Sequence, residues 1–582
     1  MAAFWLAMSL KHLNPLQSHS LFEKAFKIFM AEGAAEGSYL AWAGIVEVSC
    51  FAFDGFDQTE TRLSLLNELV DKFKGFPSDE IEGNVATMAV HAALLKGIVH
   101  PDLERWSEKS FSLRERLNGP SRIILLMNLA VLGLWRGDFC MIENSIKALQ
   151  PFENASEFAR VLKSVLGLFA FVFFGHGTSR DGLDVAAITL EFSESTGIHV
   201  WDGLVLEHAS IIANMSGDYA AAGRWLALLE KLSSTAGPWA EYCYHFASSF
   251  DALVSRDLPK AEDQCGRALV IAEKLDVRWA RLVSHRLMCL ILTEERKLDL
   301  AQKHISSAIG VARKENLPYF EFFSRFVEAY HCLKAGQRLK AIGILRGTLS
   351  WMRGHGVFNC STVPFEIQAL LLTTALDEGI ETDYVREYIC RRGIPPLPDS
   401  VSEKWPWPLK IYTMGRFVIE KGGKPLMFAG KLPRKPLAVL KAVIASSGKA
   451  SITKLSDELW PEVEGDAARR SCDIALYRLR QIIGVNGAIT TNGGSLGLTP
   501  RFVWVDAWAL DNLLEQAGML KGGNGSARAR GLADEAIGLY KGHFLPDDDE
   551  PWTAAMRERL RAGFLRLLAI SGKKREFSSE SL

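Results

Sequence analysis

Met215-Ser-Gly-Asp-Tyr-Ala-Ala-Ala222 is the stretch that shows most directly how this chain is organised. An apolar helical segment leads into it, a short polar turn ends at Asp218, and a second helix follows with Ala222 four positions past the turn. The pattern returns with turns that end at Asp257, Lys297 and Gln337 and with the small residues Ala261, Ala301 and Ala341, at steps of 39, 40 and 40 positions. Because only a small side chain lets two crossing helices approach closely, we interpret the recurrence as structural.

The same step can be followed towards the N-terminus. It meets the turns Gly177-Thr178, Arg136-Gly-Asp138, Gly97-Ile98 and Phe56-Asp57, which makes about eight helix-turn-helix repeats. A period near forty is typical of an α-solenoid of the tetratricopeptide-like type, in which stacked neighbours bury the apolar faces that single pairs leave open. We therefore predict a mainly α chain with a solenoid over residues 36–394 and an N-terminal helical cap over residues 1–35.

An aromatic residue recurs near the start of each first helix, at steps of 38, 40 and 40: Trp201, Trp239, Trp279 and Tyr319. Repeat arrays bind partners on concave surfaces, so these four side chains would form a sensor face for an unknown protein or small-molecule effector. Packing between repeats explains the same period, because a stacked core needs an aromatic side chain at a fixed place. Packing is the interpretation we favour.

Composition is that of a globular protein. The 582 residues are too many for one hydrophobic core, and 48% of them are apolar. The nine cysteines form no C-x-x-C pair and no histidine cluster has metal-ligand spacing, so we expect reduced thiols, a cytoplasmic protein, and no metal or cofactor. The apolar run Met1–Leu10 lacks the basic start of a signal peptide, and Val165–Phe174 has about half the length of a membrane span. We expect no membrane association.

Helical periodicity stops at a Pro- and Trp-rich linker over residues 395–408. Short β-favouring runs follow at Leu409–Thr413, Arg416–Glu420 and Lys424–Phe428. Three helices are then predicted: Pro436–Ser446, a short one capped by Ser451 or Thr453 that ends at Leu459, and Ala467–Ile483 capped by Asp466. A hairpin over Ile489–Leu498 around Asn492-Gly493 and a strand over Phe502–Val505 complete the region. This order predicts an α+β winged helix-turn-helix over residues 409–508.

Several motifs of this region occur in a characteristic order: Arg434-Lys-Pro-Leu-Ala-Val-Leu-Lys441, Leu459-Trp-Pro461, Glu464-Gly-Asp-Ala-Ala-Arg469, Ala475-Leu-Tyr-Arg-Leu-Arg480 and Trp504-Val-Asp-Ala-Trp508. They resemble the OmpR-type winged helix joined to the bacterial transcriptional activator domain, as in the antibiotic-regulatory-protein (SARP) family and the MalT-like regulators. The segment from Gly379 to Gly393, with the repeats before it, resembles the solenoid of the MalT-like regulators. The resemblance implies a transcription regulator that acts as an activator.

The chain departs from these regulators in two ways. They usually carry an N-terminal P-loop NTPase, whereas no G-x-x-x-x-G-K-[ST] motif occurs in this sequence, so either the switch has been lost or the chain is a shortened relative. The activator-domain likeness is confined to a short helical segment over residues 509–582, with helices predicted at Ala509–Leu520, Leu532–Tyr540 and Pro551–Ile570. A dimer on DNA is therefore left open.

Residues 409–508 carry 15 Lys and Arg against 8 Asp and Glu, a net charge of +7 in a chain whose total is −1. A basic module on an acidic body is typical of nucleic-acid binding, because phosphate neutralisation supplies much of the affinity. On the third helix, an apolar stripe should face the domain core: Cys472, Ala475, Leu476, Leu479, Ile482 and Ile483.

The opposite face of that helix carries the candidate contacts to double-stranded DNA. Candidate base readers are Arg470, Asp473, Ile474, Tyr477 and Gln481, with Asp473 more readily organising a neighbouring arginine. Expected phosphate or structural contacts are Arg469, Arg478 and Arg480. The wing is predicted at Thr491, Asn492, Gly493, Gly494 and Ser495. An ordinary solvated helix face would show the same arginines, but the ordered motifs and the domain charge favour DNA.

The sequence discriminates between three classes of function. A regulator would sense an effector with the solenoid and read promoter DNA with the winged helix, while the acidic turn Glu462–Asp466 would face RNA polymerase. An interaction scaffold would use the winged helix to bind protein, which the basic helix face disfavours. The sequence has no phosphate loop, nucleophile elbow or metal constellation, and isolated histidines such as His331 are more often core groups than catalysts, so an enzyme is not expected.

Overall fold

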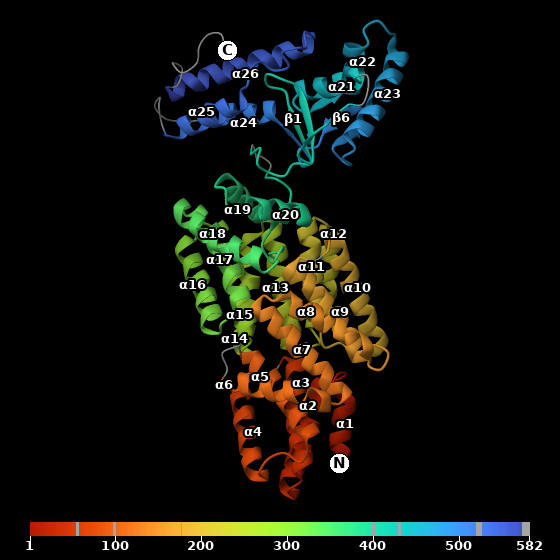
Figure 1. Ribbon diagram of the computed structural model, residues 1–582, viewed down its shortest axis with the longest axis vertical. Helices are drawn as coiled ribbons and strands as arrows, with labels where there is room; N and C mark the ends of the chain where they lie inside the picture. The colour runs from red at the N-terminus through yellow and green to blue at the C-terminus, as the bar shows by residue number, and fades with distance from the viewer. Residues whose placement is uncertain are drawn as a thin grey trace. The chain divides into compact units, whose positions relative to one another are not determined.

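The computed structural model describes residues 1–53, 58–96, 101–175, 177–397, 402–428, 432–519 and 527–572, and its ribbon is drawn in Figure 1. The chain forms two compact units, Met1–Gly393 and Ile394–Leu582. All strands of the described part lie in the second unit, and the first is helical. A mainly helical chain with repeat-like packing and small sheets near its C-terminus is thus confirmed. Within the described ranges, every helix is too short or too polar to cross a bilayer.

The helices of the first unit follow one another along the chain, and most of them pack against the next. Its first part contains α1 (Ala2–Leu10), α2 (Pro15–Glu32), α3 (Ala35–Ala52), α4 (Thr59–Phe73), α5 (Asp79–Lys96), α6 (Pro101–Ser112), η2 (Arg114–Arg116), α7 (Gly119–Arg136), α8 (Phe139–Leu149), η3 (Gln150–Phe152), α9 (Glu157–Phe169), the π-helical turn η4 (Ala170–Phe174) and α10 (Ser179–Thr196). The turns predicted at residues 97–98 and 56–57 lie outside the described residues.

The most regular part of this unit consists of four helix pairs, seen side by side in Figure 1. They are α11 (Asp202–Ser216) with α12 (Tyr219–Ser233), α13 (Pro238–Val254) with α14 (Leu258–Lys274), α15 (Arg278–Glu294) with α16 (Leu298–Lys314), and α17 (Pro318–Lys334) with α18 (Arg338–Gly354). Two further helices, α19 (Phe365–Asp377) and α20 (Thr382–Arg392), end the unit. The four turns predicted from the period all lie between the two helices of a pair.

Local chemistry explains these turns. The residue before each anchor has a left-handed backbone, which glycine adopts freely at Gly217 (φ 81°) and Gly336 (φ 77°) and which Arg256 and Arg296 also adopt. Asp218 caps α12, since its carboxylate accepts a hydrogen bond from Ala221 N at 2.9 Å. The next aspartate in the period, Asp257, caps α14 in the same way.

The recurring alanines lie where the two helices of a pair touch. Ala222, Ala261, Ala301 and Ala341 are all completely buried. The hydroxyl of Ser210 on α11 donates to Ala222 O across the pair at 3.4 Å, and that of Ser249 on α13 donates to Ala261 O at 2.8 Å. A larger side chain would hold these backbones apart, which explains why the position stays small.

The first unit also curls back so that distant repeats meet. Tyr319 on α17 donates its hydroxyl proton to Phe173 O at 3.0 Å, and Phe358 N donates to Phe174 O at 2.8 Å. Both acceptors belong to the η4 turn, far earlier in the chain. Phe53, at the end of α3, stacks on Trp239 of α13 with the ring centroids 4.1 Å apart, which is a similar link between distant helices. The array therefore encloses an interior and does not present a simple open concave face.

The second unit is a compact α+β structure. Its elements are β1 (Leu409–Tyr412), β2 (Val418–Lys421), β3 (Lys424–Pro425), α21 (Arg434–Ala445), β4 (Lys449–Ser451), α22 (Ile452–Leu459), α23 (Gly465–Ile483), β5 (Ile489–Asn492), β6 (Ser495–Leu498), β7 (Val503–Val505), α24 (Asp506–Gly518), α25 (Ala527–Leu539) and α26 (Pro551–Ser571). One sheet has the order β3-β2-β1-β7 and the other the order β4-β6-β5. β7 pairs with β1 in parallel, whereas the other pairs are antiparallel.

One hydrophobic core joins the sheets to the C-terminal helices, running from Leu409 on β1 to Leu568 on α26. The boundary that the sequence suggested between residues 508 and 509 falls inside this core, because α24 starts directly after β7. Residues 398–401 of the predicted linker, Leu520, and residues 573–582 of the C-terminal segment lie outside the described part of the chain.

Candidate nucleic-acid interface

Helix α23 is amphipathic and packs one face into the core of the second unit. Five residues of its predicted apolar stripe are less than 5% exposed, namely Cys472, Ala475, Leu476, Leu479 and Ile483, while Ile482 is partly buried. The helix begins at Gly465 with Glu464 at its N-cap, so the cap predicted at Asp466 is wrong. Asp466 instead lies in the first turn, where its carboxylate favours the positive end of the helix dipole.

One hydrogen bond is made at the end of α23, and another caps the helix that precedes it. Lys421 on β2 donates to Gly484 O at 3.1 Å, at the left-handed residue that terminates the helix. Ser451 caps the preceding α22 by accepting from Lys454 N. Sequence reasoning offered Ser451 or Thr453 for this role, and the structure selects Ser451. Sequence reasoning did not anticipate Lys421, because it comes from a strand more than sixty positions earlier.

The opposite face of α23 is open in this unit. All five candidate base readers are exposed: Arg470, Asp473, Ile474, Tyr477 and Gln481. Two of them are large apolar side chains, with Ile474 56% and Tyr477 64% exposed. Arg469 Nε lies 3.5 Å from Asp473 Oδ1, so that aspartate does hold a neighbouring arginine. This face therefore combines cationic, amide and apolar groups on a rigid helix.

The β5–β6 hairpin lies beside this helix. Its turn places Gly493 (φ 54°) and Gly494 (φ 76°) between the paired residues Asn492 and Ser495, one position later than the Asn-Gly signal suggests. Ser495 is partly buried, and the other four wing residues are exposed. Arg480 Nη2 donates to Thr491 Oγ1 at 3.3 Å, which links the helix to the hairpin. The strand β4, which the sequence did not reveal, pairs with β6 and holds the hairpin against α22.

A buried aspartate, Asp506, holds several groups of this unit together. Its buried carboxylate accepts hydrogen bonds from Thr413 N at 2.7 Å, Thr413 Oγ1 at 2.6 Å, Met414 N at 2.9 Å and Ala507 N at 2.7 Å. Burial raises the pKa of Asp506 to about 6, and the four donors act in the opposite direction. The Asp506 side chain thus closes the loop after β1 onto the start of α24.

The four period-locked aromatics lie in the interior of the first unit. Trp201 is 8% exposed, Trp239 6% and Tyr319 2%, and Trp279 is partly buried. Trp239 stacks on Tyr242 and packs edge-on against Trp279 at 5.4 Å. Contacts of this kind are packing between repeats. They do not form an open sensor face, because the curled array covers them.

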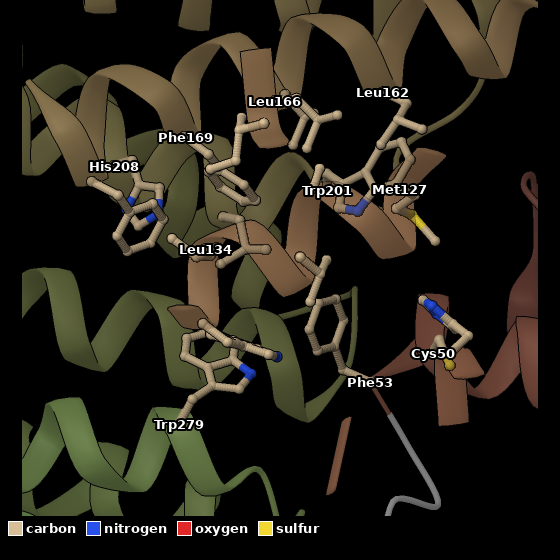
Figure 2. A pocket seen from close by; sticks show the side chains of 18 of the residues that line it. Cys50, Phe53, Met127, Leu134, Leu162, Leu166, Phe169, Trp201, His208 and Trp279 are labelled. Atoms are coloured by element: carbon tan, nitrogen blue, oxygen red, sulfur yellow. The ribbon is translucent and has the colours of Figure 1, made fainter. Parts of the chain in front are cut away.

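Two of these aromatics, Trp201 and Trp279, border a cavity that we call the chamber. It has a volume of about 130 Å³ and is walled by side chains from α3, α5, α7, α8, α9, η4, α11, α15 and α17. Side chains of several of these helices point toward the common space in Figure 2, among them Phe53, Leu134, Phe169, Trp201 and Trp279. Because its walls come from nine elements, no single motif in the sequence could reveal it.

In the sequence, the feature that most clearly marks this region is a pair of polar residues, Glu207 and His208, within the mostly apolar helix α11. His208 lines the chamber, and burial lowers its pKa to about 4. Its Nδ1 lies 3.7 Å from Glu207 Oε1, while Glu207 Oε2 is buried and has no hydrogen-bond partner among the described residues. Burial raises the pKa of Glu207 to about 8, with a hydrogen bond to Cys243 acting weakly the other way. Both side chains are therefore neutral near pH 7.

Replacing Glu207 with glutamine is expected to raise the unfolding midpoint of the first unit at pH 7. The folded chain holds the Glu207 proton up to about pH 8, whereas the unfolded chain releases it near pH 4.5, so native stability falls as pH rises between these values. Glutamine does not ionise, so the variant avoids this loss. Its free energy of unfolding should exceed that of the native protein by about 3 kcal/mol at pH 7, and the difference should vanish near pH 4.5. Thermal unfolding from pH 4.5 to 8 measures it. Glu273→Gln, at an exposed position of α14, is the control. A gain in the unfolding midpoint of Glu207→Gln that does not change with pH would contradict the expectation.

The described side chains include no cluster of three or more His, Cys, Asp or Glu suited to a metal ion. All nine cysteines are free thiols, and seven of them are buried.

Comparison with known proteins gives no family. No family model matches the chain, and no curated protein matches it. Among solved structures, a chain of the Saccharomyces cerevisiae separase–securin complex is 10% identical with a TM-score of 0.38, over 99% of this chain and 47% of that one. A circular tandem repeat protein is 12% identical with a TM-score of 0.13, over 98% and 99%. This chain thus spans about half the length of the separase–securin chain. Neither likeness bears on function.

Proposed function

We propose that this protein is a DNA-binding transcription regulator of the cytoplasm. In this proposal the second unit is an OmpR-type winged helix joined to a short activator-domain segment, with α23 as the recognition helix and β5–β6 as the wing. The first unit is an α-solenoid of about eight repeats, related to that of the MalT-like regulators, that senses an effector. The exposed acidic residues at the start of α23 are proposed to face RNA polymerase, so that the regulator activates transcription.

One observation carries the proposal: the open face of α23 presents Ile474 and Tyr477 among Arg470, Arg478 and Gln481, while the other face of the helix is buried. Ile474 and Tyr477 lie three positions apart on the helix, so their exposed side chains form one small apolar patch on this face. A major groove offers such side chains the thymine methyl group, and it offers arginine and glutamine the edges of guanine and adenine. The net charge of +7 over residues 409–508 supplies attraction to phosphates.

Binding of the full chain to a random-sequence duplex, followed by fluorescence anisotropy as salt is raised, tests this function. We expect measurable binding at low salt and a log–log slope of about −4 or steeper, as five phosphate contacts would give. Selection of a preferred sequence from a random pool should follow. Absence of binding at low salt would overturn the proposal and favour a scaffold in which Ile474 and Tyr477 contact a protein.

A further inference from the structure

The chamber in the first unit has the properties of a ligand site. Its volume of about 130 Å³ is close to that of an engineered apolar cavity of about 150 Å³ that binds benzene. Natural interiors are packed with few voids larger than a water molecule. A void of this size therefore leaves its wall side chains without partners on one side, and a bound molecule would restore those contacts.

One polar atom of a residue that lines the chamber lacks a hydrogen-bond partner among the described residues. Trp135 is 6% exposed and lines the chamber, and its Nε1 is a buried donor with no acceptor among the described residues. A buried donor without an acceptor costs about 1–3 kcal/mol, so a ligand acceptor at this point would be favourable.

His91 offers the complementary group. Asn128 Nδ2 donates to Thr87 O at 2.9 Å, which fixes its amide so that Oδ1 faces His91 Nδ1 at 2.5 Å. His91 Nδ1 must therefore carry the proton, and Nε2 is left as an acceptor. Burial lowers the pKa of His91, which keeps this neutral form at pH 7. The residues that line the chamber thus include one hydrogen-bond donor and one acceptor among mostly apolar side chains.

The lack of charged side chains in the described lining of the chamber argues against an ionic ligand. No Lys, Arg, Asp or Glu is among the described residues that line the chamber, and both of its histidines have lowered pKa values. An ionised ligand would lose its hydration without gaining a counter-charge. The π-helical turn η4, a feature often found at functional sites, contributes Phe173 to the same wall.

We propose that the chamber binds a small neutral molecule built on one aromatic ring, or an apolar ring of similar size, that carries a hydrogen-bonding group. The ring fills the space between Trp201, Trp279 and Leu134, and its polar group meets Trp135 Nε1 or His91 Nε2. This inference rests on the proposed function for its biological role, since the molecule would be the effector that the solenoid senses.

Calorimetric titration of the full chain with phenol, indole and benzoate tests the proposal. Phenol and indole are expected to bind one per chain with Kd below about 1 mM, and benzoate at least about tenfold more weakly because its carboxylate would be buried. Saturable binding of none of the three, or binding of benzoate as tight as that of phenol, would overturn it.

A pair of variants locates the binding. Ala130 on α7 lines the chamber and is 2% exposed, so Ala130→Leu places a larger side chain into the empty space. We expect it to abolish phenol binding, whereas Ala227→Leu at an exposed position of α12 leaves it unchanged. Retained phenol affinity in a folded Ala130→Leu variant contradicts the location.

Native crystals soaked in 4-bromophenol give a measurement that needs no variant. The anomalous bromine signal is expected within the chamber, and a signal only elsewhere would contradict the proposal. DNA is absent from all of these measurements, so failure of the chamber and failure of DNA binding are told apart.

Discussion

Changing Arg469, Arg470 and Arg480 together to alanine is expected to weaken binding to random-sequence duplex DNA by about 100-fold at low salt. Each arginine that contacts a phosphate releases a counterion, so removal of three should flatten the log–log salt slope by up to about 2.7. The structure supports this choice, because Arg470 and Arg480 are exposed and Arg469 is only partly buried on the open face of α23. Anisotropy titrations of both proteins at four or more salt concentrations give affinity and slope.

The control must remove the same charge elsewhere. Arg136, Arg224 and Arg346 are exposed on helices of the first unit and have no ion-pair partner among the described residues. Their joint replacement with alanine should leave both affinity and slope within about twofold of the native values, since non-specific attraction by the whole chain is small at a net charge of −1. Equal losses in both triple variants would show that α23 is not the contact surface.

Replacing Asp506 with alanine is expected to have the largest effect on stability. It leaves the buried N–H groups of Thr413, Met414 and Ala507 without their acceptor, together with the Thr413 hydroxyl. Each unsatisfied buried donor costs about 1–3 kcal/mol, so a loss of about 4 kcal/mol or more in the second unit is expected. Hydrogen exchange followed by mass spectrometry over β1 and α24 measures the opening free energy of this unit separately from the first.

A matched variant separates charge from hydrogen bonding. Asp457 is exposed on α22 and makes no ion pair among the described residues, so Asp457→Ala removes the same charge without orphaning a donor. We expect it to change the opening free energy by less than about 0.5 kcal/mol. Similar exchange rates in the Asp506→Ala and native proteins would refute the anchoring role of Asp506.

Features with a local physical cause could be predicted from the sequence. The alanine after each turn, the apolar stripe of α23 and a cap of α22 at Ser451 or Thr453 follow from periodicity and capping chemistry within a few residues. The parallel pairing of β1 with β7, the cap that Lys421 places on α23 and the enclosed interior join residues far apart in the sequence. No periodicity encodes such contacts, which is why β4 and the chamber were missed.

The hydrogen bonds from Tyr319 and Phe358 to the η4 turn change how the first unit should respond to loss of a repeat. In a linear array each repeat interacts only with its neighbours, so stability is nearly additive and single repeats can be deleted or inserted. Here a deletion between α10 and α17 would break the contacts that close the array. Repeat number in this unit is therefore fixed by closure, and its unfolding should be a single cooperative step.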